Sequence, residues 1–296
     1  MARVNSIHKF TRCWKAIFMI ILFFALALGQ EVDKESSKDY RIEVIIDTIQ
    51  KKNYLQTEGK EIRFISSDGK ILKTMPYKNW QDKIGIFISP YLKCLIKAKD
   101  TPAEWRKDSL GQRKRIKEAR VEFSYINAKG EEKWKKNFDI IYTLEEMDET
   151  SIRPYFFVFS RDGSRIVFVK NGIFNSEWEY SSDIFVYDTL GNEVASVYKT
   201  HGIENDGYLK ISPDGKIIVA EVFFPPKDSA QISAKHLLFL DVETGRTKVV
   251  KAEGERWSGY GFPLDNKRIQ LATNKHPKSI TIPFDELPDD LLVLFK

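Results

Sequence analysis

The chain has 296 residues, of which 42% are hydrophobic and 30% are charged, and its formal net charge is +5. This composition excludes a disordered chain and a membrane protein with many spans, and the length suits one large domain or two smaller ones. Residues 1–29 hold four of the 47 basic residues and no acidic residue, which leaves 43 basic against 42 acidic residues in 30–296. A remainder near +1 does not create the broad positive field that non-specific nucleic-acid binding needs, so we expect no nucleic-acid partner.

The first 29 residues have the three parts of a secretory signal peptide. A basic stretch ending at Lys15 precedes 14 uncharged residues from Ala16 to Gly29, and small residues close this run. A membrane-spanning helix needs about 20 apolar residues, so we expect cleavage and a periplasmic or extracellular protein. The alternative is a signal-anchored membrane protein, and the sequence predicts membrane contact only in that case.

Cleavage would leave Cys94 as the only cysteine, because the other one is Cys13. A single cysteine cannot form an intramolecular disulfide, so core packing has to hold the exported domain together. We expect Cys94 to be a small core residue on a strand rather than a reactive thiol.

Two kinds of hairpin alternate along the chain. The first kind, two apolar strands around a tight polar turn, occurs at 157–169, 208–222 and 260–272, with a weaker copy at 85–97. The second kind occurs at 62–74, 121–136, 184–199 and 237–251, with glycines 61, 61 and 54 residues apart. In the first kind, Asp162-Gly163, Asp214-Gly215 and Asp265-Asn266 are residue types that accept the positive φ of a tight turn.

The alternation predicts an all-β fold, namely a β-propeller of four-stranded antiparallel blades. Each first-plus-second pair supplies four short strands in about 50–60 residues, which is typical of a blade. Four blades result if hairpins 62–74 and 260–272 join into a composite blade that closes the ring. Five result if 41–47 and 279–282 add strands, and an irregular β-sandwich is the competing interpretation.

The corresponding domain boundaries follow the repeats. We expect a signal peptide at 1–29, an N-terminal extension with room for one strand at 30–60, the propeller at 61–285 and a tail at 286–296. The segments 160–168, SRDGSRIVF, and 212–219, SPDGKIIV, resemble the S-P-D-G-K signature of TolB-like, WD-repeat-like bacterial propellers. The segments 184–188, IFVYD, and 238–241, LFLD, are similar to the strand that follows in that family. The signature residues are structural in the family, so the resemblance implies the fold and no activity.

One segment between strands has a helix signal. Thr101 to Glu104 form a capping box with Pro102 at the first helical position, and Gly111 would end the helix. The run RKRIK at 113–117 is the only basic run after residue 29. We expect it to be a solvated loop, and contact with an anionic surface such as lipid headgroups or polysaccharide is the alternative.

Blade topology places both hairpin turns of each blade on one rim and all other connections on the opposite rim. In this sequence the hairpin turns are short and the long loops share the second rim, where a rigid scaffold usually displays binding groups. Four of the five tryptophans after residue 29 fall in those loops. Packing over the blade tops is the alternative role for each tryptophan. The candidate binding residues are Trp80, Trp105, Glu177, Trp178, Glu179, Arg256 and Trp257.

The sequence gives little sign of catalysis. The motifs G-x-S-x-G, H-E-x-x-H, G-x-G-x-x-G and the P-loop do not occur, and His201, His236 and His276 are isolated. We expect no catalytic residue, no metal and no cofactor. The leading hypothesis is an exported, non-catalytic module that binds an envelope or extracellular protein, a peptide or a glycan. The alternative is a carbohydrate-active enzyme that uses loop carboxylates such as Glu177 and Glu179.

Overall fold

The structure, a computed structural model, describes most of the chain after residue 39. The described residues are 40–51, 54–76, 84–90, 92–141, 153–173, 180–203, 206–224, 234–250, 257–263, 268–273, 275 and 280–287. The predicted signal peptide and C-terminal tail lie outside them, apart from residues 286 and 287. Residues from Tyr40 onward form one compact unit, so the strand expected within 30–60 belongs to that unit.

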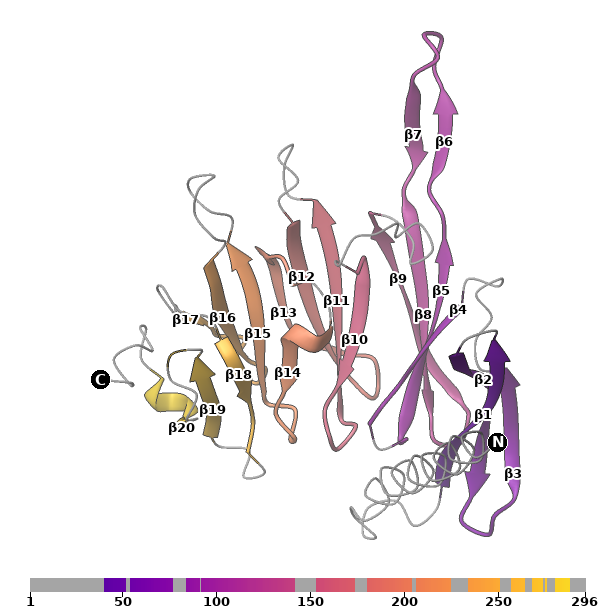
Figure 1. Cartoon of the computed structure of the whole chain (residues 1–296), viewed down its shortest axis with the longest axis horizontal. Coiled ribbons are helices and arrows are strands. Elements are labelled where there is room, and N and C mark those ends of the chain that lie inside the picture. The colour runs from indigo at the N-terminus through magenta and orange to yellow at the C-terminus, as the bar shows by residue number, and fades with distance from the viewer. Residues whose placement is uncertain are drawn as a thin grey trace, which may run out of the picture. The chain divides into compact units, whose positions relative to one another are not determined.

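The described residues form twenty strands in antiparallel sheets (Figure 1). Two sheets have three strands each. One contains β1 (Tyr40–Lys51), β2 (Tyr54–Ser66) and β3 (Ile71–Pro76), and the other contains β18 (Trp257–Gly261), β19 (Arg268–Thr273) and β20 (Ile280–Pro283). The first four-stranded sheet contains β4 (Ile84–Ile88), β5 (Cys94–Thr101), β8 (Ala119–Asn127) and β9 (Glu132–Ile140). The second contains β10 (Tyr155–Phe159), β11 (Arg165–Ile173), β12 (Tyr180–Asp188) and β13 (Glu193–His201). The third contains β14 (Leu209–Ile211), β15 (Ile217–Phe224), β16 (Ala234–Asp241) and β17 (Thr247–Val250). A separate two-stranded sheet pairs β6 (Glu104–Lys107) with β7 (Arg113–Lys117).

The predicted fold class is confirmed: the protein is all-β, with small antiparallel sheets of the β-propeller kind. Of the two blade arrangements, the structure has the one with five sheets, since β1 covers 41–47 and β20 covers most of 279–282. Hairpin β2-β3 pairs with β1, and hairpin β18-β19 pairs with β20. In the described part of the chain, the hairpins at 62–74 and 260–272 therefore lie in different sheets and form no composite blade.

The turns of the first kind of hairpin are built alike. The hydroxyl of Ser160 accepts a hydrogen bond from the backbone N–H of Arg165 and donates one to Asp162, and Gly163 has a φ of 75°. The buried hydroxyls of Ser89 and Ser212 accept backbone N–H groups at the matching positions. In the weaker copy Leu92 takes the glycine position with a φ of 56°, which explains why this repeat is harder to see in the sequence.

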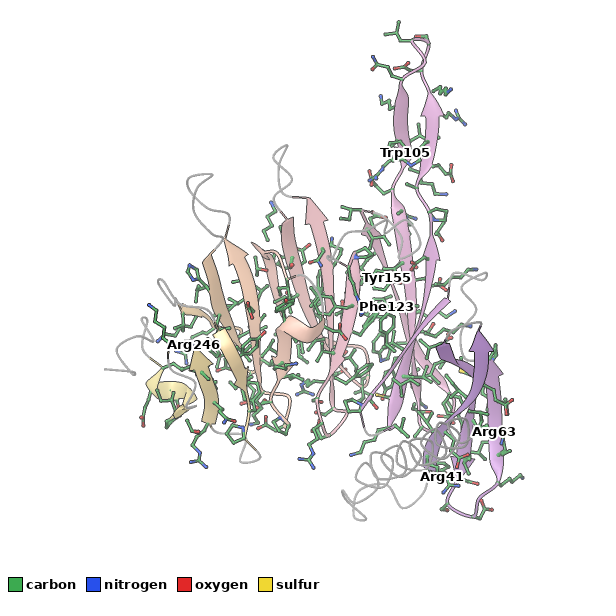
Figure 2. All side chains as sticks on the ribbon, in the orientation of Figure 1. Arg41, Arg63, Trp105, Phe123, Tyr155 and Arg246 are labelled. Atoms are coloured by element: carbon green, nitrogen blue, oxygen red, sulfur yellow. The ribbon has the colours of Figure 1, made fainter. Side chains whose placement is uncertain are left out.

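Aromatic side chains fill the space between neighbouring sheets. Phe123 of β8 lies 4.9 Å, centroid to centroid, from both Phe157 of β10 and Phe168 of β11, and all three are buried. The other face of the β10–β13 sheet contributes Val167 and Val186 to a second cluster, which it shares with β14, β15 and β16. Sheets that pack through both faces form a stack of blades, and Figure 2 shows Phe123 in such a layer.

The prediction for Cys94 is confirmed, and the predicted helix is wrong. Cys94 is buried in β5 and belongs to the aromatic cluster. The segment predicted as a helix at 101–111 instead contains β6 and a turn. Glu104 pairs with Lys117 across the strands instead of capping a helix, because the pairing of β5 with β8 continues into β6 and β7.

Candidate functional site

The structure places few of the predicted binding residues. Trp80, Arg256 and the loop residues Glu177, Trp178 and Glu179 lie outside the described residues. Trp257 starts β18, where its Cα is paired with that of Thr273 in the neighbouring strand β19. Trp105 lies in β6, in a different sheet. Of the predicted residues, the described part of the chain contains Trp105 and Trp257, and these two lie in different sheets.

The short hairpin turns form one rim, which we call the hairpin rim. Its described residues are 67–70, 89–90, 92–93, 128–131, 161–164, 189–192, 213–216 and 242–246. Neighbouring turns on this rim are bonded to each other. The ammonium group of Lys93 donates to the carbonyl of Asp162 at 3.4 Å, and the N–H of Asp162 donates to the carbonyl of Pro213 at 3.3 Å. Trp134 Nε1 donates to the carbonyl of Thr189 at 3.1 Å. Several turns of this rim therefore make contacts that hold neighbouring blades together.

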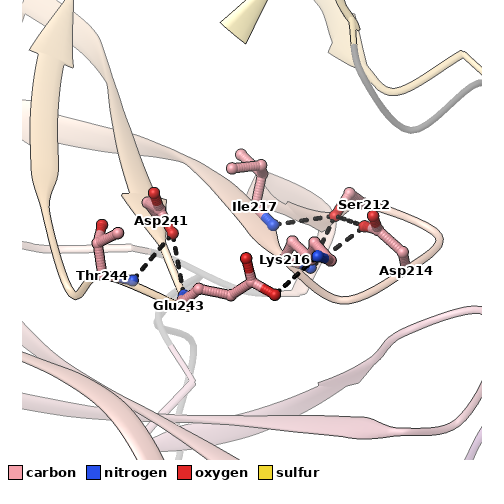
Figure 3. A network of polar contacts seen from close by, with 7 residues as sticks. All are labelled: Ser212, Asp214, Lys216, Ile217, Asp241, Glu243 and Thr244. Carbon is pink, nitrogen blue, oxygen red and sulfur yellow. Dashed lines mark hydrogen bonds and ion pairs between the residues drawn. The ribbon is translucent and has the colours of Figure 1, made fainter. Parts of the chain in front are cut away.

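Within a single blade the two hairpin turns are also joined (Figure 3). The hydroxyl of Ser212 accepts hydrogen bonds from the N–H groups of Lys216 and Ile217, which fixes the first turn. The carboxylate of Asp241 organises the second turn in the same manner. Lys216 and Glu243 then form an ion pair of 2.7 Å between the two turns. These charged residues serve the turns themselves, so we do not assign them to a binding site.

The opposite rim carries a feature that the sequence analysis missed, a projecting hairpin of residues 102–118 that we call the arm. Strands β6 and β7 continue β5 and β8 beyond their four-stranded sheet (Figure 1). Residues 104–112 are all exposed, and Trp105, Leu110 and Ile116 are 48%, 81% and 46% exposed. A two-stranded hairpin with solvent on both faces adds little to a core. The arm is thus available for contact with something outside the propeller.

The tip of the arm is a well-formed turn. The carboxylate of Asp108 accepts hydrogen bonds of 2.9 Å from the N–H groups of Leu110 and Gln112, and Gly111 has a φ of 77°. These bonds hold the exposed Leu110 side chain at the end of the hairpin. The signal that would have revealed the turn is present in the sequence, because Asp-Ser-Leu-Gly-Gln at 108–112 matches Asp-Thr-Leu-Gly-Asn at 188–192.

Polar and cation–π contacts hold the two strands of the arm together. The guanidinium of Arg115 lies 4.7 Å from the ring centroid of Trp105, and it forms an ion pair of 2.8 Å with Glu118. Lys117 forms an ion pair of 2.7 Å with Glu104. The hydrogen bond from Lys117, together with its charge, holds the pKa of the Glu104 carboxyl below its usual value. These contacts join the two strands of the arm over 104–118, the part of it that lies beyond the core.

The base of the arm is anchored in the core. Asp100, the residue before the end of β5, is 5% exposed and accepts a hydrogen bond from the hydroxyl of Tyr155 in β10 (Figure 2 labels Tyr155). Burial, followed by the charge of Asp100, raises the pKa of Tyr155, so this hydroxyl keeps its proton. Ala103 packs against the same core cluster. The base of the arm is therefore fixed against the neighbouring blade.

A hollow lies among the first strands of four sheets. It has a volume of about 590 Å³ and is lined mainly by apolar side chains, among them Phe87, Val158, Ile211 and Phe262. Asp206 lines it as well and is 3.1 Å from Arg153, with which it forms an ion pair. The hollow offers shape and apolar surface, but its lining shows no pairing of a nucleophile with a base.

The described residues provide little for metal or thiol chemistry. They contain no group of three or more His, Cys, Asp or Glu side chains that would hold a metal ion. Burial is the largest influence on the thiol of Cys94 and raises its pKa to about 11, in spite of the hydrogen bond with Ser89. A buried thiol of this kind is not a nucleophile at neutral pH. In the same residues we find no helix that has the length and apolarity to span a bilayer.

Comparison with known proteins gives similarity of fold only. No family model matches the chain, and no curated protein matches it. The chain is similar to the hydrazine synthase of Kuenenia stuttgartiensis, with 15% identity and a TM-score of 0.37 over 81% of this chain and 75% of that chain. The tricorn protease shows 11% identity and a TM-score of 0.43 over 81% of this chain and 20% of that one. The β-propeller domain of the Trilobed protease from Pyrococcus furiosus shows 10% identity and a TM-score of 0.34 over 83% and 80%.

Proposed function

We propose that this protein is an exported, non-catalytic binding module, a TolB-like β-propeller that contacts an envelope or extracellular partner through the rim that carries the arm. The observation that carries the proposal is the exposure of the arm on both faces, with Trp105 and Leu110 in contact with solvent. Exposed aromatic and aliphatic side chains on a hairpin stabilise a complex when a partner covers them and removes their apolar surface from water. On the hairpin rim, several turns already contact neighbouring blades. This also favours the opposite rim, which carries the arm, as the binding face.

Replacement of the arm tests this proposal. Glu104 and Lys117 are Cα partners in β6 and β7, so Asn-Gly in place of residues 105–116 gives a two-residue hairpin loop that keeps the strand register and the buried Ala119. Because the arm makes few core contacts, the shortened protein should fold and unfold cooperatively like the intact one. The measurement is capture from an envelope extract by both proteins, followed by direct titration of the retained component against each. Equal affinity for both proteins would contradict the proposal.

The leader has its own test. A cleaved signal peptide removes about 27 to 29 residues, whereas an anchor leaves the mass of the full chain. Intact mass spectrometry of the exported protein separates these two outcomes. Removal of the leader supports a periplasmic or extracellular module, and retention would replace this part of the proposal by a membrane-anchored one.

A further inference from the structure

Among the described residues, the arm carries more positive charge than its own ion pairs neutralise. Residues 102–118 contain six basic and three acidic residues, which gives a net charge of +3. Glu104 and Glu118 are used in ion pairs with Lys117 and Arg115, and the carboxylate of Asp108 is used by the turn.

The remaining cations are arranged unfavourably for an isolated hairpin. The Cα partners in the register of β6 and β7 include Arg106 with Lys114 and Lys107 with Arg113. Two successive cross-strand pairs thus place like charges opposite each other, which destabilises a sheet unless a counter-charge is near. Within the described part of the chain, Arg106, Lys107 and Lys114 form no ion pair. The charge of Arg106 acts on Glu104, but that carboxylate is already paired with Lys117. An anionic partner would relieve this repulsion.

Apolar side chains lie among these cations. Leu110 at the tip is 81% exposed, between Lys107 on one strand and Lys114 on the other. Trp105 and Ile116 are about half exposed further along the hairpin. A surface with anionic groups outside and hydrocarbon a few ångströms below would match both the cations and the apolar side chains of the arm. The cations would bind the headgroups, and leucine and tryptophan would enter the interface.

We infer that the arm binds the surface of an anionic phospholipid bilayer, with Leu110 entering the interface and Arg106, Lys107 and Lys114 at the phosphate groups. This inference rests on the proposed function, since it assigns a partner to the same arm. A second copy of the chain is a poor occupant, because two arms of net charge +3 repel each other. An acidic peptide or an anionic polysaccharide would satisfy the charges and leave Leu110 exposed.

A fluorescent label at the tip tests the inference without interference from the apolar leader. In the full chain with Cys13→Ser, Leu110→Cys is labelled with an environment-sensitive dye, and the buried Cys94 stays unlabelled. Addition of vesicles of phosphatidylglycerol mixed with phosphatidylcholine should shift the emission to the blue. Pure phosphatidylcholine vesicles should not, and added salt should reverse the shift. The control is Leu190→Cys, which places the dye on a 78% exposed leucine of the hairpin rim.

Removal of charge tests the role of the cations. Each cation near an anionic bilayer strengthens binding by about fivefold, so replacing Arg106, Lys107 and Lys114 by alanine should weaken the tip-dependent binding about 100-fold. The control removes the same net charge from three exposed residues outside the arm, Lys70, Lys210 and Arg246, and should leave the dye response unchanged.

Three results would overturn the inference: no shift on anionic vesicles, an equal shift on neutral vesicles, or an equal loss in both charge variants. A shift with polyglutamate or with an acidic polysaccharide, and none with vesicles, would replace the bilayer by that class of partner. If vesicles fail while the arm is still needed for capture from the envelope extract, the inference fails and the proposed function stands. If the arm is not needed for capture, the proposed function itself fails.

Discussion

Two turns of this protein have the same local construction and different surroundings. Residues 108–112 and 188–192 read Asp-Ser-Leu-Gly-Gln and Asp-Thr-Leu-Gly-Asn, and in both an aspartate accepts the N–H groups two and four residues on. Leu110 and Leu190 are 81% and 78% exposed. The first turn ends a basic, exposed arm, and the second lies on the hairpin rim against Trp134.

The difference shows that the turn sequence determines the local backbone conformation, whereas the surrounding strands determine whether the turn packs against the fold or stays exposed. At 189–192 the turn is a packing surface, since a Cβ added at Gly191 would lie 2.7 Å from the Trp134 ring. At 109–112 nothing lies within 4 Å of a Cβ added at Gly111. One turn is therefore constrained by the stability of the fold, and the other is open to selection for contact with a partner.

The largest expected effect comes from alanine at the two glycines. Gly191→Ala introduces a side chain at positive φ, which costs about 1–2 kcal/mol, and it overpacks Trp134, which costs about 1–3 kcal/mol. Gly111→Ala has only the first cost, so it should lower the free energy of unfolding by about 1 kcal/mol. Urea unfolding of the two variants measures the difference. Equal losses would show that the turn at 191 is not a packing surface.

Replacing a tryptophan near each turn should show the same contrast, with a larger loss of stability beside the turn at 188–192 than beside the turn at 108–112. Trp134 is partly buried and donates Nε1–H to the carbonyl of Thr189, whereas Trp105 is half exposed. Trp134→Phe should lower the free energy of unfolding by about 1–2 kcal/mol because it removes this hydrogen bond and some packing. Trp105→Phe should change it by less than about 0.5 kcal/mol. The same urea titration checks both values, and a larger loss at Trp105 would mean that the arm packs on the propeller.

A smaller effect should appear at low pH. Burial, the largest single influence, acts to raise the pKa of Asp188, but hydrogen bonds from Asn192 and Leu190 outweigh it and the pKa is lowered from 3.8. The folded state then favours the ionised form, so its contribution to stability is present above about pH 4 and is lost as the pH falls further. Asp188→Asn should flatten the dependence of stability on pH below about pH 4. An unchanged acid slope in urea unfolding would refute this.

Much of the fold was predictable because its signals are local. Hairpins at 157–169 and 208–222 carry Ser and Asp-Gly at positions where the turn needs a hydroxyl acceptor and a positive φ, and the structure has both. The strands at 41–47 and 279–282 were predicted only as an option, because the competing arrangement paired the sequence-distant hairpins 62–74 and 260–272, and a local pattern does not show which sheet edges meet. The sequence could not choose between a composite blade and two three-stranded sheets for this reason. In the structure the strands at 41–47 and 279–282 pair with β2 and β19, their neighbours in sequence.

The arm was missed because a local signal competed with strand pairing. Thr101, Pro102 and Glu104 form a good capping box, yet β5 and β8 pair over eight register positions up to Thr101, and continuation of this pairing prevails. The pattern of the turn at 188–192 was present again at 108–112. Of the predicted site, Trp105 is exposed on the arm, while the loop residues Trp80, Trp178 and Arg256 stay predictions. The segments that hold these loop residues have no recurring sequence pattern of the kind that predicted the turns.

The two substitutions with the smallest expected effect on stability should distinguish the two turns most clearly by their effect on binding. Leu110→Asp and Leu190→Asp each place a carboxylate on a side chain that is about four-fifths exposed, so each should change the free energy of unfolding by less than about 0.5 kcal/mol. Leu110→Asp should nevertheless abolish the binding that depends on the arm, because it puts a negative charge where the contact is apolar and surrounded by cations. Leu190→Asp should bind like the unmodified protein. Titration of the captured component against both variants measures this, and equal binding by the two would mean that the tip of the arm makes no contact.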